Sequence, residues 1–264
     1  MISKFIWLPL ALFAAGYGGL CAWMYVKQRD LMYFPQFTQA QAAQTDFAIE
    51  RGGVTLRGWL INPGKTRAIV YFGGNGERIE GNREDFLRWF PEHSVYLVAY
   101  RGYGASEGQP SEQALLGDAL AIFDKAQSQH PGQSVAVIGR SLGSGVASYV
   151  ASQRPVAKLV LITPFDSFAE VGQAHYGWLP VRWLSTDRYE SANYLRKYKG
   201  PLLVIRAGKD EVIPAASTDR LIEALPSAPR MVAIPGAGHN GLDSDPAYGK
   251  ALSDFMAPAD SSAL

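Results

Sequence analysis

The sequence predicts an α/β fold, in which helices flank a mostly parallel sheet of eight strands and an apolar helix precedes the sheet. Two observations predict this class. From residue 47 onward, short runs rich in β-branched residues alternate with amphipathic segments, as in successive βαβ units. The later runs, such as Val-Ala-Val-Ile, are apolar throughout, which is typical of parallel strands buried on both faces.

The N-terminal segment contains an uncharged apolar run at residues 5–26, which as a helix spans about 33 Å, enough to cross a bilayer. A cleaved signal peptide is the alternative, but its apolar region is usually about 7–15 residues long and ends in a small-x-small site. We therefore expect residues 1–30 to form a membrane anchor and residues 31–264 to form one folded domain. The charges that flank the run nearly balance, so they give little guidance on topology.

Strands and helices alternate along the folded domain. The first two predicted strands are separated by Gly52-Gly53, which favours a hairpin. The eight strands are expected at residues 47–51, 54–61, 68–72, 95–100, 134–138, 159–163, 202–206 and 231–234. The helices are expected at residues 83–90, 112–128, 142–153, 215–224 and 246–256.

One long connection interrupts this alternation, at residues 165–200 between the sixth and seventh strands. We call it the lid segment, and we interpret it as a cap over the carboxyl ends of the strands. Ordinary packing of an irregular connection is the alternative. Its aromatic residues are Phe168, Tyr176, Trp178, Trp183, Tyr189, Tyr194 and Tyr198.

The composition excludes several classes of protein. The 25 Lys and Arg residues balance the 24 Asp and Glu residues, so the net charge of +1 gives no reason to bind nucleic acid. A hydrophobic content of 47% indicates a chain that buries a large core rather than a disordered chain. The single cysteine, Cys21, excludes an intrachain disulfide and a cysteine-rich metal site.

The pattern G-x-S-x-G occurs twice, so its context must decide between Ser141 and Ser106. Ser141 follows a predicted strand and opens a predicted helix, which is the strand-turn-helix setting of a nucleophile elbow. Ser106 also follows a strand, but Gly108, Gln109 and Pro110 come next and prevent a helix from starting beside it. We predict that Ser141 is a nucleophile and that Ser106 is a turn residue. A serine that merely caps a helix is the alternative for Ser141.

A serine hydroxyl needs a general base to take its proton, and a histidine is the usual base. His93, His130 and His175 fall on or beside helical segments and the lid segment. His239 follows the last predicted strand, in a glycine-rich loop that can carry the imidazole over the carboxyl edge of the sheet. We therefore predict that His239 is the base.

The base needs a carboxylate, which is expected between the serine and the histidine along the chain. Asp210 follows the seventh predicted strand and is the preferred acid. Asp166, which follows the sixth strand, is the alternative, and Glu211 is a third carboxylate beside Asp210. For all three, a solvated loop residue without a function is the competing interpretation.

An oxyanion hole needs two preorganised hydrogen-bond donors. The backbone N–H that follows the nucleophile is one, and here it belongs to Leu142. The second is expected from the glycine-rich loop after the third strand, where we assign the backbone N–H of Asn75. The same loop is not a phosphate-binding loop, because the Lys-Ser/Thr pair of that motif is absent.

These motifs resemble those of the α/β-hydrolase superfamily, and more narrowly those of membrane-anchored alpha/beta-hydrolase-domain-containing proteins of eukaryotes and their bacterial counterparts. The resemblance covers nearly the whole chain. It rests on Leu31-Met32-Tyr33-Phe34-Pro35, Gly74-Asn75-Gly76, Tyr100-Arg101-Gly102-Tyr103-Gly104-Ala105-Ser106-Glu107-Gly108, Gly139-Arg140-Ser141-Leu142-Gly143-Ser144-Gly145, Asp210-Glu211-Val212-Ile213-Pro214 and Gly236-Ala237-Gly238-His239-Asn240.

The resemblance implies the α/β-hydrolase fold and assigns a role to each motif. It implies a nucleophile at Ser141, an acid at Asp210, a base at His239, and oxyanion donors at Asn75 and Leu142. The segment that contains Ser106 is then a structural loop of the family. This chain departs from the pattern at two places, because relatives usually have His-Gly where it has Gly73-Gly74 and an aspartate where it has Ala99.

The expected function is that of a serine hydrolase that cleaves an acyl ester or thioester through an acyl-enzyme on Ser141. No metal or organic cofactor is implied. The resembling family includes esterases, lysophospholipases, acyl-protein thioesterases and some peptidases, so a serine peptidase stays open, as does a non-catalytic scaffold that binds a partner. The expected substrate is a small acyl compound or a lipid. Resemblance to signal-anchored relatives implies a domain outside the cytoplasm, on the periplasmic side.

Overall fold

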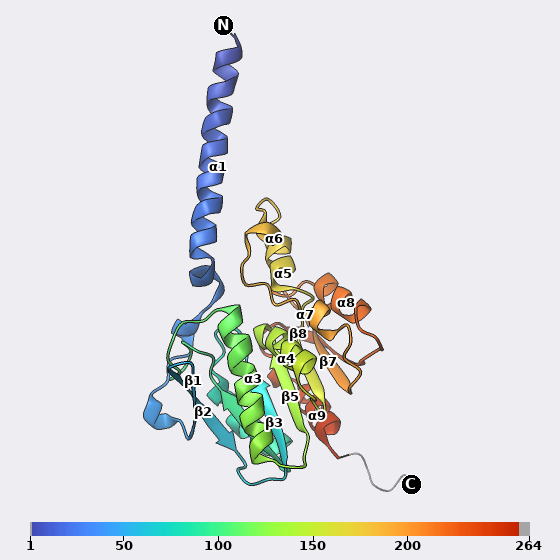
Figure 1. Ribbon diagram of the computed structural model, residues 1–264. Helices are drawn as coiled ribbons and strands as arrows, with labels where there is room; N and C mark the ends of the chain where they lie inside the picture. Colours follow the sequence, from blue (N-terminus) through green and yellow to red (C-terminus); the bar gives the residue numbers. More distant parts are fainter. Residues whose placement is uncertain (1, 259–264) are drawn as a thin grey trace.

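The structure is a computed structural model, and it describes residues 2–258 (Figure 1). Residue 1 of the predicted anchor and residues 259–264 of the predicted folded domain lie outside the described residues. Within that range the strands form one eight-stranded sheet in the order β1-β2-β4-β3-β5-β6-β7-β8. The predicted α/β class, with a mostly parallel sheet flanked by helices, is confirmed.

The sheet begins at one edge with the predicted hairpin of β1 (Phe47–Arg51) and β2 (Val54–Ile61). Gly52 and Gly53 form its turn, with φ of 59° and 77°, a region in which glycine carries no Cβ penalty. Strand β2 also pairs antiparallel with β4, and every later pairing is parallel. The other strands are β3 (Arg67–Phe72), β4 (His93–Val98), β5 (Val135–Arg140), β6 (Leu159–Ile162), β7 (Leu202–Lys209) and β8 (Arg230–Gly238).

The central strands are buried on both faces, as their continuous apolar runs predict. All four residues of β6 and the first five residues of β5 are buried. Each fully buried aliphatic side chain contributes about 1.5–3 kcal/mol of hydrophobic free energy, so these strands form the stable centre that positions the ends of the sheet. Helices cover the sheet in two packed pairs, α3 with α4 and α2 with α9.

The helices of the folded domain lie close to their predicted positions. Ser111 caps α3 by accepting a hydrogen bond from the backbone N–H of Ala114, and Asp245 caps α9 in the same way from Ala247. The helices are α2 (Arg83–Trp89), α3 (Glu112–Gln129), α4 (Leu142–Gln153), α8 (Ala215–Glu223) and α9 (Pro246–Met256). The short 3₁₀ helices are η1 (Pro35–Phe37), η2 (Ala42–Gln44), η3 (Ile79–Asn82) and η4 (Leu242–Ser244).

Strands β7 and β8 are longer than predicted, and the glycine-rich stretch at residues 235–238 is strand rather than loop. Gly208 explains the difference, because a Cβ there would lie 2.5 Å from the Cα of Pro235. Only glycine lets the two backbones approach this closely. As a consequence, Asp210 and His239 each follow directly on the last residue of a strand, at the same edge of the sheet.

Strand β4 is displaced from its predicted position at residues 95–100. It begins at His93, which therefore lies in the sheet and not beside a helix as predicted. It ends at Val98, because the chain turns at Tyr100, whose carbonyl accepts a hydrogen bond from the backbone N–H of Tyr103.

Helix α1 (Ile2–Met32) projects away from the sheet (Figure 1). Within the described part of the chain, one helix near the N-terminus is long and apolar enough to cross a membrane, with a mean hydropathy of 1.3 and none of that window buried. The lid segment contains α5 (Phe168–His175), α6 (Val181–Leu184) and α7 (Ser191–Leu195). Helices α5 and α6 extend beyond the sheet toward the side on which α1 stands (Figure 1).

Candidate active site

Ser141, His239 and Asp210 form one hydrogen-bonded row at the carboxyl edge of the sheet. The Nε2 atom of His239 lies 2.9 Å from the Oγ of Ser141. The Nδ1 atom of His239 lies 2.9 and 3.0 Å from the two carboxylate oxygens of Asp210. The three side chains follow β5, β8 and β7, and the serine and the histidine are both buried, which strengthens hydrogen bonds between them.

Ser141 occupies a strained turn between β5 and α4. Its φ of 51° and ψ of −119° place a residue with a side chain where L-residues are rarely found. Two glycines permit this turn, because a Cβ at Gly139 would lie 2.2 Å from the carbonyl oxygen of Gly143. A Cβ at Gly143 would lie 2.0 Å from the carbonyl oxygen of Phe72. The close contact of strand and helix therefore creates the elbow that the sequence predicts.

Asp210 is held by the backbone of its own loop as well as by the histidine. Its Oδ1 accepts hydrogen bonds from the N–H groups of Val212 and Ile213, at 3.0 and 2.8 Å. Burial raises the pKa of Asp210, but the hydrogen bonds from His239 and from these two N–H groups outweigh burial and hold the pKa below its ordinary value. The carboxylate is therefore ionised and able to fix the orientation of the imidazole.

The loop after β3 lies beside Ser141. A Cβ built on Gly74 would lie 3.6 Å from the Cβ of Ser141. The backbone N–H of Asn75 donates no hydrogen bond to any described residue. Leu142 is the first residue of α4, so its N–H has no acceptor within the helix. Within the described residues, neither of the two predicted donor N–H groups has a hydrogen-bond acceptor, and their role as oxyanion donors stays a prediction.

The side chain of Asn75 connects this loop to the end of α1. Its Oδ1 accepts hydrogen bonds from the backbone N–H of Phe34 and from the hydroxyl of Tyr103, at 3.2 and 2.7 Å. Its Nδ2 donates to the carbonyl oxygen of Met32 at 2.6 Å. Residues 31–35, which the sequence singled out, are therefore the segment that fixes α1 to the loop beside Ser141.

Glu77 organises the same loop and was not predicted. Its carboxylate accepts hydrogen bonds from the backbone N–H of Gly74 at 2.5 Å and from the hydroxyl of Tyr71 at 2.6 Å. Asn82 and Arg140 donate two more. Burial raises the pKa of Glu77, but the positive charge of Arg140 and these hydrogen bonds hold it below its ordinary value.

Arg140 joins three parts of the site and was also missed. One guanidinium nitrogen lies 3.0 Å from the carboxylate of Glu77. Another donates to the carbonyl oxygen of His239 at 3.2 Å and to the Oδ1 of Asn240 at 3.1 Å. Arg140 directly precedes Ser141, so its side chain connects the loop after β3, the turn of Ser141 and the backbone of His239. Its place between Gly139 and Ser141 is the only sequence signal that could have drawn attention to it.

The two alternative carboxylates lie apart from the histidine ring. Asp166 accepts hydrogen bonds from the hydroxyl of Ser217 and from the guanidinium of Arg220, both at 2.5 Å. Neither oxygen of Asp166 contacts His239 within the described residues. Glu211 instead accepts the backbone N–H of His239 at 3.2 Å and so helps to position the histidine.

Ser106, in the second G-x-S-x-G pattern, lies in a turn. Its Oγ accepts a hydrogen bond from the backbone N–H of Arg57 at 2.8 Å and donates to the carbonyl oxygen of Ala99 at 2.9 Å. The next helix does not begin until Glu112. The structure therefore confirms the predicted turn and gives this hydroxyl two backbone partners.

The two departures from the family pattern are neighbours in space. Gly73 and Ala99 both line one small cavity of about 10 Å³, together with Tyr100 and other residues. A Cβ at Gly73 would lie 2.5 Å from the Cγ2 of Ile79, so a larger side chain there would displace that isoleucine. The hydroxyl of Tyr100 donates to the carbonyl oxygen of Gly73 at 2.8 Å and supports this stretch of the loop.

Side chains that could hold a metal are not gathered in the described part of the chain, where no group of three or more His, Cys, Asp or Glu residues is suitably placed. The row of Ser141, His239 and Asp210 presents a hydroxyl, an imidazole and a carboxylate, and backbone N–H groups without acceptors lie in the loop after β3 and at the start of α4. This set is suited to nucleophilic attack and proton transfer at a carbonyl carbon.

Comparisons with known proteins agree with this architecture. A sequence profile described as serine aminopeptidase, S33 matches residues 66–185. An uncharacterized protein of Mycobacterium tuberculosis is 38% identical over 247 residues, which cover 88% of each chain. The alpha/beta hydrolase domain-containing protein aho-3 of Caenorhabditis elegans is 30% identical over 199 residues, covering 74% of this chain and 58% of that protein.

A lipase and an esterase are among the similar proteins. The lysophosphatidylserine lipase ABHD12 of Rattus norvegicus is 29% identical over 167 residues, which cover 55% of this chain and 42% of the lipase. The solved structure of Est1E from Butyrivibrio proteoclasticus has a TM-score of 0.65 at 18% sequence identity and covers 80% of this chain and 97% of that one. The fold and the relatives together show that this chain belongs to the α/β-hydrolase superfamily.

Proposed function

We propose that this protein is a membrane-anchored serine hydrolase that cleaves an acyl ester or thioester through an acyl-enzyme on Ser141. The observation that carries the proposal is the row of contacts from Ser141 through His239 to Asp210, each between 2.9 and 3.0 Å, built on a strained elbow. A serine that only capped a helix would have no need of a positive φ or of a histidine at hydrogen-bond distance.

Acylation begins when the Oγ of Ser141 attacks the carbonyl carbon of the substrate. The Nε2 atom of His239 takes the hydroxyl proton, and the ionised Asp210 stabilises the imidazolium that forms. The carbonyl oxygen becomes negative and accepts hydrogen bonds from the backbone N–H groups of Asn75 and Leu142. The tetrahedral intermediate collapses as His239 returns the proton to the departing alcohol or thiol, which leaves the acyl group on Ser141.

Deacylation repeats these steps with water as the nucleophile. His239 takes a proton from a water molecule, whose oxygen attacks the acyl carbon, and the same two N–H groups stabilise the oxyanion. Protonation of the Oγ of Ser141 then releases the carboxylic acid and restores the enzyme. The contacts of Arg140 with Glu77 and with the backbone of His239 hold the loop of Asn75, the turn of Ser141 and the histidine in fixed relative positions through both half-reactions.

An acyl ester or thioester is the preferred substrate class for two reasons. The comparisons include a lysophosphatidylserine lipase and an esterase. The end of the apolar helix α1 is hydrogen-bonded to the side chain of Asn75, a residue that also carries one of the two proposed oxyanion donors. A membrane anchor would therefore hold the site close to lipids. The serine aminopeptidase description of the matching profile supports a peptidase as the second candidate.

The experiment is a comparison of leaving groups on the purified full chain in detergent micelles. We expect p-nitrophenyl butyrate and an acyl thioester to be hydrolysed with an initial burst of product equal to the enzyme concentration, because acylation precedes slower deacylation. An aminoacyl anilide should react far more slowly. Preferred hydrolysis of the anilide would identify a peptidase. The absence of turnover on all three substrates, in protein that is folded, would favour the scaffold.

The anchor and its orientation are part of the same proposal. We expect α1 to be retained as a single-pass anchor with the catalytic domain on the periplasmic side and the lid segment over the site. Protease added to intact spheroplasts should then digest the domain. Protection until lysis would place the domain in the cytoplasm and leave the enzyme assignment unchanged. A chain that lacks residues 1–26 should no longer sediment with membranes but should still hydrolyse p-nitrophenyl butyrate.

A further inference from the structure

We propose that the tip of the lid segment, residues 176–184, inserts into the interface of the lipid bilayer that α1 crosses and so forms a second membrane contact. The proposal rests on the membrane anchor of the proposed function. We call residues 176–184 the lid tip; it joins α5 to α6 and continues through α6. The proposed partner of its exposed side chains is the lipid of the leaflet that faces the folded domain.

The lid tip leaves three large aromatic side chains more than half exposed. Trp183 is 88% exposed, Trp178 is 63% exposed and Tyr176 is 52% exposed. Exposed clusters of aromatic residues are uncommon on soluble surfaces, whereas Trp and Tyr are enriched at the level of lipid headgroups. The composition of the lid tip therefore matches a bilayer interface.

The position of the lid tip relative to α1 selects the bilayer as its partner. The hydroxyl of Tyr17 donates a hydrogen bond to the carbonyl oxygen of Trp178 at 2.8 Å. Tyr17 lies within the uncharged run at residues 5–26, so the lid tip lies beside the part of α1 that is expected to enter the bilayer. If α1 spans the bilayer, the lid tip contacts it on the membrane side of Val26. Figure 1 shows α6 on the side of the folded domain from which α1 projects.

Several backbone groups of the lid tip and its charged side chain have partners within the protein, which lowers the cost of insertion near lipid. Gln173 donates a hydrogen bond to the carbonyl oxygen of Leu179 at 2.9 Å, in addition to the contact of Tyr17 with Trp178. Arg182 is the one charged residue between positions 176 and 184. It forms an ion pair with Glu170 at 2.6 Å, which lowers the cost of bringing it near lipid.

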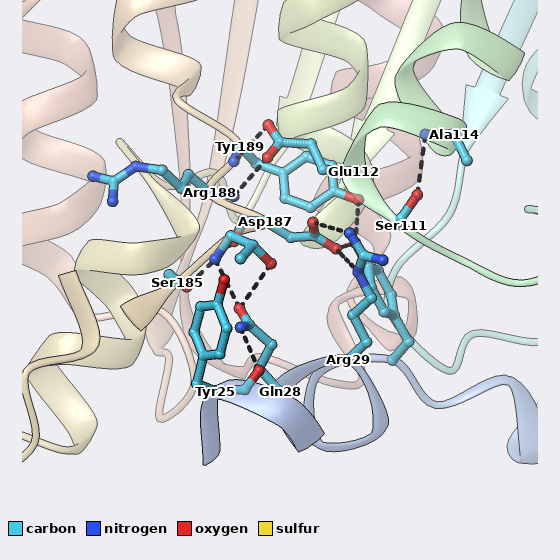
Figure 2. A network of polar contacts seen from close by, with 12 residues as sticks. Tyr25, Gln28, Arg29, Ser111, Glu112, Ala114, Ser185, Asp187, Arg188 and Tyr189 are labelled. Atoms are coloured by element: carbon cyan, nitrogen blue, oxygen red, sulfur yellow. Dashed lines mark hydrogen bonds and ion pairs between the residues drawn. The ribbon is translucent and has the colours of Figure 1, made fainter. Parts of the chain in front are cut away.

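A polar clamp fixes the base of the lid segment to the end of α1. Arg29 donates two hydrogen bonds to the carboxylate of Asp187, each at 3.2 Å, and Figure 2 shows this pair. Asp187 is buried and also accepts the hydroxyl of Tyr33 at 2.8 Å. The side chain of Gln28 accepts the backbone N–H of Thr186 at 2.7 Å. The lid segment therefore cannot swing away from α1 without breaking an ion pair whose carboxylate is buried.

The end of α5 that leads into the lid tip also contacts the loop of Asp210. A ring nitrogen of His175 lies 2.7 Å from the carbonyl oxygen of Val212, and the N–H of Val212 donates to Asp210. The lid segment thus joins the membrane side of the molecule to the loop of the acid. A lipid substrate that leaves the bilayer beside the lid tip meets the lid segment before it reaches Ser141.

The test measures the depth of single nitroxide labels on the full chain in phosphatidylcholine vesicles. The native Cys21 reports on α1, and the other labels are introduced in a Cys21→Ser background as Trp178→Cys, Trp183→Cys and Leu87→Cys. Leu87 is the matched control because it is 47% exposed on α2. We expect the labels at positions 178 and 183 to be accessible to oxygen and shielded from a water-soluble nickel chelate, and the label at position 87 to show the opposite.

The possible outcomes distinguish a failure of the lid-tip proposal from a failure of the anchor, and they do not depend on catalysis. A lipid-shielded label at Cys21 with water-exposed labels at positions 178 and 183 would overturn the inference and leave the anchor intact. Water exposure at all three positions would overturn the inference together with the anchor. The same depths in a Ser141→Ala background are expected, because insertion does not depend on turnover.

A second variant tests the clamp. Arg29→Gln removes both hydrogen bonds to Asp187, so we expect the spectrum of the label at position 178 to show faster motion while the label at position 87 is unchanged. Unchanged motion at position 178 would contradict the claim that the clamp holds the lid tip beside α1.

Discussion

Two loops of this molecule carry the same five-residue pattern, G-x-S-x-G, and they use it in opposite ways. Their serines are almost equally buried, with Ser141 at 9% and Ser106 at 8% exposure. In the loop of Ser106, the residues with positive φ are glycines, Gly104 and Gly108. In the loop of Ser141, the serine itself has the positive φ. Backbone strain on a residue with a side chain, rather than burial or the motif, distinguishes the two.

The hydrogen-bond partners of the two serine hydroxyls also differ. The hydroxyl of Ser106 bonds to backbone groups of Arg57 and Ala99 and so closes a turn. The hydroxyl of Ser141 has the ring of His239 as its partner. Each loop also has a neighbouring arginine. Arg101 in the first loop pairs with Asp118 on α3, and Arg140 in the second pairs with Glu77 in the loop after β3. One set of contacts closes a turn, and the other brings a hydroxyl and an imidazole together.

The largest difference is expected between Ser141→Ala and Ser106→Ala. Loss of the nucleophile should lower kcat by on the order of 10⁶-fold, with little change in the free energy of unfolding. Ser106→Ala should keep kcat within about tenfold but should lose about 1–3 kcal/mol of stability, because the buried N–H of Arg57 loses its acceptor. Ester hydrolysis and urea unfolding of both variants measure this. A folded Ser106→Ala protein that is the less active of the two would reverse the assignment.

The next largest difference concerns the carboxylates Asp210 and Asp166. We expect Asp210→Asn to lower kcat by about 10⁴-fold, because the imidazolium formed in each half-reaction loses its orienting charge. Asp166→Asn should leave kcat within about tenfold and should lower the unfolding midpoint, because Asp166 pairs with Arg220 and Ser217. Steady-state kinetics on both variants provide the measurement, and a collapse of activity confined to Asp166→Asn would move the acid to the end of β6.

A smaller contrast is expected between the two arginines. Arg140→Lys keeps the positive charge, but one ammonium group cannot replace the two guanidinium nitrogens that contact Glu77 and the backbone of His239. We therefore expect kcat to fall by about 10–100-fold with KM nearly unchanged. Arg101→Lys loses the two-point contact with Asp118, so the free energy of unfolding should fall by about 1–2 kcal/mol with kcat unchanged. Equal effects of the two variants on kcat would show that neither loop is specialised.

The smallest expected effect is the pH dependence of stability that Glu77 contributes. Its pKa in the folded protein lies below the ordinary value of 4.5, so the folded state binds fewer protons than the unfolded state between the two values. The stabilisation is therefore complete above pH 4.5 and is lost as pH falls through the lower, folded pKa. Urea unfolding from pH 7 to pH 3 should show a stability advantage over Glu77→Gln that narrows in acid. An advantage that grows as pH falls would contradict the direction of the shift.

Much of the fold was predictable because its signals are local. The apolar runs placed all eight strands, and the glycines around Ser141 marked the elbow. The full lengths of β7 and β8 were not predictable, because they depend on the close approach of Gly208 to Pro235 across the sheet. That approach is a property of two paired strands and leaves no periodic signal in either one.

The candidate site was predictable only where a motif carried it. Ser141, Asp210 and His239 follow strands in motifs that can be read locally. The pair of Arg140 with Glu77 joins residues 63 positions apart, and no charge pattern along the chain connects them. The clamp of α1 to the lid segment spans 158 positions. Such contacts depend on which surfaces the fold brings together, so they become visible only in three dimensions.

The most direct measurement of the central claim is the mapping of a fluorophosphonate label on the full chain. The probe phosphorus reacts with a serine activated by a neighbouring base, and the adduct resembles the tetrahedral intermediate. Peptide mass spectrometry should find one adduct, on Ser141, and labelling should be lost in Ser141→Ala and in denatured protein but kept in Ser106→Ala. An adduct on Ser106 instead, or no adduct in folded protein that hydrolyses esters, would contradict the account.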